Sequence, residues 1–119
     1  MQPLIPARTR KSGPEAAIQQ KLMERLKALN WFVMATHGNS FQSGFPDLFV
    51  CHARYGQRWI EVKNPLGYSF TAAQLECFPK MSANGVGIWI LVGSHDEEIV
   101  KLNSPANWEY YYLKRYMRF

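Results

Sequence analysis

Residues 44–63 read GFPDLFVCHARYGQRWIEVK, with two apolar runs of strand length on either side of a short polar turn. The turn, residues 53–56 (ARYG), has the composition of a hairpin. In an antiparallel hairpin, the start of the first strand lies beside the end of the second. The pattern therefore predicts a two-stranded ribbon whose two outer ends lie together.

Three charged residues lie at this shared end of the ribbon. Asp47 opens the first run, and Glu61 and Lys63 come near the end of the second. Because residues i and i+2 of a strand share a face, Glu61 and Lys63 point the same way and Val62 points opposite. The flanking residues are typical of strands buried on both faces. These charges are therefore expected beside a core, where a charge is costly.

Two interpretations of these charges are open. The simpler one is a surface salt bridge between Lys63 and an acid. In the functional one, two carboxylates hold a hard divalent cation such as Mg²⁺, which prefers oxygen ligands and keeps several waters. Such a cation can polarise a phosphodiester and activate a bound water. Lys63 could then orient or deprotonate that water and offset charge in the transition state. The apolar flanks favour the functional interpretation.

The motifs taken in order resemble a family of nucleases. Residues 46–47 (PD) and 61–63 (EVK) resemble the PD-(D/E)xK signature, and the wider pattern resembles the VRR-NUC (virus-type replication-repair nuclease) branch. That family carries an early helix with a Glu, a Gly-x-Pro-Asp strand, a Glu-x-Lys strand and a following helix with a Gln. This sequence has Glu15, residues 44–47, residues 61–63 and Gln74 in the same order. The resemblance covers residues 13–95.

The resemblance implies an α/β fold of the restriction-endonuclease type, a mixed sheet in the order α-β-β-β-α-β flanked by helices. It also implies a divalent-metal-dependent DNA endonuclease. Asp47, Glu61 and the backbone carbonyl of Val62 are then expected to ligate Mg²⁺ or Mn²⁺. Lys63 is expected to position the attacking water, and Gln74 to hold the site through hydrogen bonds.

Glu15 has two interpretations, one catalytic and one structural. The resemblance implies that it reaches a second metal ion or its water shell. Residues 12–15 (SGPE) also fit a capping box, in which the Glu side chain accepts a hydrogen bond from the cap residue's backbone N–H. A negative charge in the first turn would further suit the helix dipole. The resemblance favours the catalytic role.

The small members of the resembled family look like dimers that cut branched DNA. The resemblance therefore implies a homodimer that acts on junction or branched DNA in replication, repair or recombination. It also fits a phage or mobile-element origin. The alternative function is a non-catalytic nucleic-acid-binding module that has kept the fold, and a third is an adaptor protein. The intact set of Asp47, Glu61 and Lys63 argues against the non-catalytic binding module.

Length and composition limit the number of domains and the kind of partner. The chain has 119 residues and a formal net charge of +5, which predicts one domain (residues 14–119) and is compatible with a polyanionic partner. A proline-bearing arm, residues 1–13, carries Arg8, Arg10 and Lys11, and it is expected either to follow a phosphate backbone or to be a loose terminus. His37, in a polar loop after a strand, is a candidate phosphate or water contact.

Two cysteines and no apolar run of transmembrane length predict an intracellular, cytoplasmic protein, in a bacterial or phage-infected cell if the resemblance holds.

The remaining helices and strands are predicted from hydrophobic periodicity and from the Gly, Pro and Asn residues that end such elements. The sequence predicts a helix from residue 12 to Asn30, a buried strand over 31–36, and a helix that starts at residues 71–74 and stops at Asn84. Pro79 is expected to kink or shorten that helix. A buried strand is expected over 87–93.

The tail from about residue 95 contains an acidic helix start at residues 96–98 and a possible last helix from residues 104–105. Its aromatic residues lie among basic ones, so they could stack on bases, cover a core edge or form a subunit interface. The pattern favours the last two of these roles. The aromatic residues are Trp108, Tyr110, Tyr111, Tyr112 and Tyr116.

Overall fold

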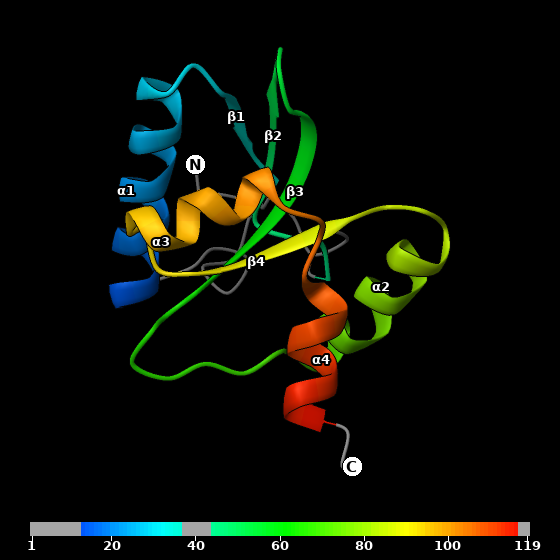
Figure 1. The fold of residues 1–119 in the computed structure, drawn as a ribbon. Coiled ribbons are helices and arrows are strands. Elements are labelled where there is room, and N and C mark those ends of the chain that lie inside the picture. The colour runs from blue at the N-terminus through cyan, green and yellow to red at the C-terminus, as the bar shows by residue number, and fades with distance from the viewer. Residues whose placement is uncertain (1–12, 37–43, 117–119) are drawn as a thin grey trace, which may run out of the picture.

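The computed structural model describes residues 13–36 and 44–116 as a mixed α/β domain (Figure 1). The predicted order α-β-β-β-α-β is confirmed, and three short helical segments follow it. The predicted contacts Arg8, Arg10, Lys11 and His37 lie outside the described residues. The elements are α1 (Gly13–Ala28), β1 (Phe32–Ala35), β2 (Leu48–His52), β3 (Gly56–Lys63), α2 (Ala72–Ala83), β4 (Ile88–Val92), α3 (Asp96–Ile99), η3 (Val100–Asn103) and α4 (Trp108–Tyr116).

The sheet has the strand order β1-β2-β3-β4 and is mixed. β1, β2 and β3 form an antiparallel meander, while β4 pairs with β3 in parallel. The hairpin predicted for residues 44–63 is confirmed, since Leu48 lies opposite Ile60 and the turn leads into Gly56 with a positive φ of 83°. Asp47 therefore lies at the end of the ribbon where β3 finishes.

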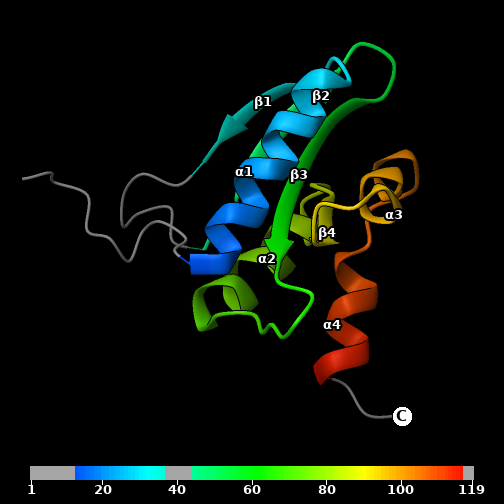
Figure 2. The same cartoon turned by 90° about the vertical axis from the view of Figure 1, so that its left-hand side faces the viewer.

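Helix α1 covers one face of the sheet. It runs antiparallel to β3, so its first turn lies at the level where β3 ends (Figure 2). Its buried leucines, Leu22 and Leu26, share one apolar cluster with Leu48, Ile60 and Val62 from the sheet. The helical spacing of these leucines explains why this segment forms a helix and which side of it faces the core.

Helices α2 and α4 cover the other face of the sheet. Phe78 of α2 and Trp108 of α4 pack edge to face, with ring centroids 5.0 Å apart, in a cluster that includes Ile88 and Ile90 of β4. Tyr111 and Tyr112 pack against the same cluster, so these aromatics of the tail cover a core edge. The helix α2 continues through Pro79 and ends at Asn84, beyond which Gly85 adopts a positive φ of 87°.

The segment after β4 caps the outer edge of that strand with side chains. The amide of Asn107 accepts a hydrogen bond from the Ile90 N–H (2.6 Å) and donates one to the Ile90 carbonyl (3.0 Å). The Glu98 carboxylate accepts a hydrogen bond from the Val92 N–H (2.6 Å). An uncovered edge strand is a template for unwanted pairing. These side chains therefore satisfy backbone N–H and C=O groups on the free edge of β4, as a neighbouring strand would.

Two expectations need correction. β1 is not a buried strand, because Phe32 and Met34 are 55% and 51% exposed. It lies at the edge of the sheet, and only its other face, with Val33 and Ala35, packs on the core beneath α1. The last helix begins at Trp108 instead of residues 104–105, because Asn107 is engaged with β4.

Among the helices of the described ranges, none combines the length and the apolar character that a bilayer crossing needs.

Candidate active site

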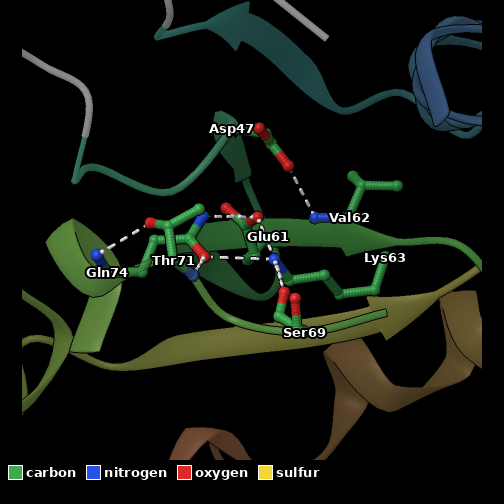
Figure 3. Close-up of polar contacts among 7 residues, drawn as sticks. All are labelled: Asp47, Glu61, Val62, Lys63, Ser69, Thr71 and Gln74. Carbon is green, nitrogen blue, oxygen red and sulfur yellow. Dashed lines mark hydrogen bonds and ion pairs between the residues drawn. The ribbon is translucent and has the colours of Figure 1, made fainter. Parts of the chain in front are cut away.

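Asp47, the residue before β2, is held by hydrogen bonds to the neighbouring chain segments on both sides, at the end of β1 and in β3. Its backbone carbonyl accepts a hydrogen bond from the Thr36 N–H (2.9 Å), which extends the β1–β2 pairing by one residue. Its side-chain Oδ2 accepts a hydrogen bond from the backbone N–H of Val62 (2.8 Å), and the side chain is buried (Figure 3). A buried acceptor bound to a backbone donor of the neighbouring strand has a fixed direction. Asp47 is thus fastened to β3 directly beside Glu61.

Gly44, the first residue of the Gly-x-Pro-Asp motif, is required by a close approach to α2. A Cβ atom at this position would lie 2.8 Å from the Ala73 carbonyl oxygen and 3.0 Å from the Cβ of Cys77. The loop that carries Asp47 therefore rests against the first turns of α2. Any larger residue would push the loop and the helix apart. The motif's glycine thereby fixes the Asp47 strand relative to the helix that carries Gln74.

Glu61 and Lys63 project from β3 on the side of α2, and Val62 projects on the side of α1, as the period of the strand predicts. The Glu61 side chain is fully buried and the Lys63 side chain is 5% exposed. Their charged groups are 3.1 Å apart. A buried ion pair of this kind is expensive to form unless its remaining donors and acceptors are satisfied.

The Lys63 ammonium has an acceptor for each of its three N–H bonds. Nζ donates to the Ser69 carbonyl oxygen (2.9 Å) and to Gln74 Oε1 (3.1 Å), and it pairs with Glu61 Oε2. It also lies 4.7 Å from the centre of the Phe70 ring, a favourable position for a cation. Lys63 is therefore fixed as a positive charge beside the carboxylates.

Gln74 joins the ion pair to the start of α2. Its Nε2 donates to Glu61 Oε2 (2.8 Å), while its Oε1 accepts from Lys63 and from the Thr71 N–H (3.0 Å). Thr71 Oγ1 in turn accepts from the Gln74 N–H (3.1 Å), which completes a capping box. This arrangement fixes the orientation of the amide, because the carboxylate requires its donor and the ammonium requires its acceptor. The start of α2 and the charged pair form one hydrogen-bond network.

Glu15 lies in the first turn of α1 and is half-buried. In the described part of the chain, no group of three or more His, Cys, Asp or Glu side chains gathers as metal ligands. Glu15, on α1, comes from a different element than Asp47 and Glu61. Its expected reach to a second metal ion or to a water shell stays a prediction, and its capping partner Ser12 lies outside the described residues.

The donor set fits a magnesium-type cation. Asp47 and Glu61 bring two buried carboxylates to neighbouring positions on β2 and β3, with the peptide of Val62 between them. Mg²⁺ is bound in proteins by one or two carboxylates and keeps several of its waters, whereas zinc sites use His and Cys in larger number. Cys77, the nearest thiol to this loop, does not suit such a role, because burial raises its pKa above 9.0 and keeps it protonated.

Sequence reasoning missed two parts of this site. Ser69 contributes only a backbone carbonyl, which leaves no signature in a sequence. Thr71 could have been found, because Thr-x-x-Gln at the start of a helix is a capping-box pattern.

Comparison with known proteins agrees with this fold. No family model and no curated protein matches the chain. A solved structure described as a VRR_NUC domain matches with a TM-score of 0.62 and 25% sequence identity, over 77% of this chain and 97% of that chain. The expected fold and resemblance are thus confirmed: this chain is similar to a VRR_NUC domain, with a four-stranded mixed sheet flanked by helices in a nuclease-like fold.

Proposed function

We propose that this protein is a divalent-metal-dependent DNA endonuclease that hydrolyses phosphodiester bonds. The observation that carries the proposal is the buried Glu61–Lys63–Gln74 network, which lies beside Asp47 at one end of the ribbon. Burying this charged network costs free energy of desolvation, and apolar residues could fill the same space without that cost. Such a network is typical of a functional site. The similarity to a VRR_NUC domain supports a nuclease-type activity for that site.

Asp47, Glu61 and the carbonyl of Val62 would hold Mg²⁺ or Mn²⁺ in the proposed site. When bound, the cation supplies polarisation of the phosphate and a more acidic water. All three N–H bonds of Lys63 are engaged, so its fixed positive charge would position the attacking water through its electric field and offset the charge developing on the phosphate oxygens. The attacking water would lose a proton to solvent as its oxygen forms the new bond to phosphorus. The P–O bond to one bridging oxygen breaks, and that oxygen leaves with the electron pair and takes a proton from solvent. Gln74 keeps Glu61 and Lys63 in place.

The proposed partner is branched DNA, and the proposed assembly is a homodimer. A domain of this size offers little surface to a duplex, and a two-fold dimer would present two sites to two strands. The net charge of +5 supports a polyanionic partner. The basic residues Arg8, Arg10 and Lys11 are proposed phosphate contacts, and His37 is a proposed contact to phosphate or water.

The test is cleavage of single-stranded, duplex, flap and four-way DNA by the parent chain and by Asp47→Asn, with Mg²⁺, with Mn²⁺ and with EDTA. We expect metal-dependent cutting with a preference for branched DNA, and loss of cutting in Asp47→Asn. Asn can still accept the hydrogen bond from Val62, so the variant should keep the parent's melting temperature. Cutting in EDTA by a clean preparation, or by Asp47→Asn at the parental rate, would refute the proposal.

A second measurement separates catalysis from binding. Compared at equal folded fraction, Lys63→Ala should cut about 100- to 1,000-fold more slowly, the range seen when one group that stabilises transition-state charge is removed. Its affinity for DNA, measured in Ca²⁺ by gel shift, should change little. The alternative function, a nucleic-acid-binding module without activity, predicts binding by the parent chain and no cutting in any metal.

A further inference from the structure

The buried side of α1 changes character along the helix. Its C-terminal half is apolar, with Leu22 and Leu26 in the core. Its N-terminal half brings polar side chains to that side, with Gln19 buried and Glu15 half-buried one turn earlier, next to the partly buried Ile18. Residues four apart lie on the same side of a helix, so Glu15 and Gln19 continue the side that faces the sheet.

This polar half lies at the candidate site. α1 runs antiparallel to β3 (Figure 2), and Leu22 shares a cluster with Val62 near the end of that strand. One helical turn back from Leu22 moves about 5.4 Å toward the end of the ribbon. Gln19, three residues before Leu22, therefore lies nearer than Leu22 to the end of the ribbon at which Asp47 contacts the backbone of Val62.

Gln19 is 6% exposed, and its Oε1 atom is buried without a hydrogen-bond partner among the described residues. A buried acceptor without a donor has lost its hydrogen bonds to water without replacement, which is destabilising. Native proteins meet such a need with a protein group or with an ordered water that has several polar partners. Leu or Met at this position would continue the apolar side of α1 without the cost. A glutamine here indicates a donor supplied from outside the described residues.

We propose that Gln19 is a positioning residue of the metal centre, and that its Oε1 accepts a hydrogen bond from a water in the hydration shell of the divalent cation. The inference rests on the proposed metal-dependent function. Mg²⁺ retains several waters in protein sites. A metal-bound water has its oxygen on the cation, so it can only donate, and its partners must be acceptors. Gln19 supplies a neutral acceptor, and the carboxylate of Glu15 supplies a charged one on the same side of α1.

The test is the melting temperature of the full chain during a Mg²⁺ titration, without DNA, for the parent and for Gln19→Met, Gln19→Glu and Gln20→Met. Methionine keeps the shape of glutamine but removes the acceptor. We expect metal-free Gln19→Met to melt at or above the parent's temperature, and its apparent Kd for Mg²⁺ to rise about tenfold, the lower end of the range for partners of metal ligands. Gln19→Glu keeps an acceptor and should bind Mg²⁺ at least as tightly as the parent.

Gln20→Met is the matched control, since Gln20 is exposed and bonds to Glu24 on the solvent side of α1. It should leave the Kd unchanged. The inference is overturned if Gln19→Met binds Mg²⁺ within twofold of the parent, or if metal-free Gln19→Met melts well below it. If the parent itself binds no Mg²⁺, the metal-dependent function fails and this inference fails with it. If the parent binds Mg²⁺ and Gln19→Met matches it, only this inference fails.

Discussion

Two Glu–Lys pairs in this protein lie in different surroundings. Glu61 and Lys63 are 0% and 5% exposed and lie inside the sheet beside Asp47. Glu98 and Lys101 are 14% and 30% exposed and lie on the short helices that cap β4. Each pair is bound to a third group: Gln74 bridges the first pair, and the hydroxyl of Tyr111 accepts from Lys101 (2.9 Å) in the second.

The two pairs differ in whether apolar side chains could replace them without loss of stability. The Glu98–Lys101 pair satisfies the edge of β4 at the margin of the core, where charges keep part of their hydration. The Glu61–Lys63 pair has lost its hydration, and apolar side chains of the same size could fill its place at equal or better stability. The cost of the buried pair therefore supports its proposed catalytic role, whereas local structure accounts for the marginal pair.

The largest expected effect is on stability when one member of the buried pair is removed. Lys63→Met leaves Glu61 as a buried charge without its cation and should lower the free energy of unfolding by about 3–5 kcal/mol. Lys101→Met, the matched change in the marginal pair, should cost less than about 1 kcal/mol. Urea unfolding of both variants at pH 7 measures the difference.

The double variant Glu61→Gln/Lys63→Met serves as the control. Its neutral amide still accepts from Gln74, so it should recover most of the lost stability. If the double variant were no more stable than Lys63→Met, burial of an uncompensated charge would not be the cause of the loss.

The next effect concerns the loop that brings Asp47 to the buried pair. Gly44→Ala places a Cβ 2.8 Å from the Ala73 carbonyl oxygen, and overpacking of this kind costs about 1–3 kcal/mol. The loop and α2 should separate, so DNA cleavage should fall together with the free energy of unfolding. Chemical denaturation and a cleavage assay at equal folded fraction measure both. Parental cleavage in a destabilised Gly44→Ala would show that the site tolerates movement of this loop.

Glu15 extends the comparison to a carboxylate outside both pairs. Glu15→Gln keeps a hydrogen-bond acceptor for a helix cap but removes the charge that a hard cation or its waters prefer. We expect a melting temperature within a few degrees of the parent and cleavage in Mg²⁺ at least about tenfold slower, within the range for partners of metal ligands. Parental cleavage rates would assign Glu15 to helix capping alone.

The smallest effect is the pH dependence of the marginal pair. Burial lowers the pKa of Lys101, but the hydrogen bonds to Glu98 and Tyr111 and the charge of Glu98 outweigh it and raise the pKa above 10.5. A pKa raised by folding contributes stability that is fully present below the unfolded value and is lost as pH rises through the folded value. The stability difference between the parent and Lys101→Met should therefore be constant from pH 7 to 9 and shrink above about pH 10.5. Urea midpoints at pH 8 and 11 check this, and a difference that grows with pH would contradict it.

Local patterns determined much of this protein. The period of residues 44–63 set the hairpin, the face shared by Glu61 and Lys63, and the position of Asp47 beside them, because strand geometry fixes these relations from spacing alone. The leucine spacing likewise predicted α1, and Asn84–Gly85 predicted the end of α2. The order of the motifs was enough to indicate the VRR_NUC resemblance.

Only the tertiary structure determined the features that depend on partners distant in sequence. The edge position of β1 exposes Phe32 and Met34 although their local composition is that of a core strand. Asn107 delays the last helix because its amide pairs with β4, seventeen residues away in sequence. Gln19 shares the helical side of Leu22 and Leu26, but its side chain is polar, and only the packing of α1 against the sheet shows that it is buried. Burial and hydrogen-bond partners are properties of the assembled layers, and no local spacing encodes them.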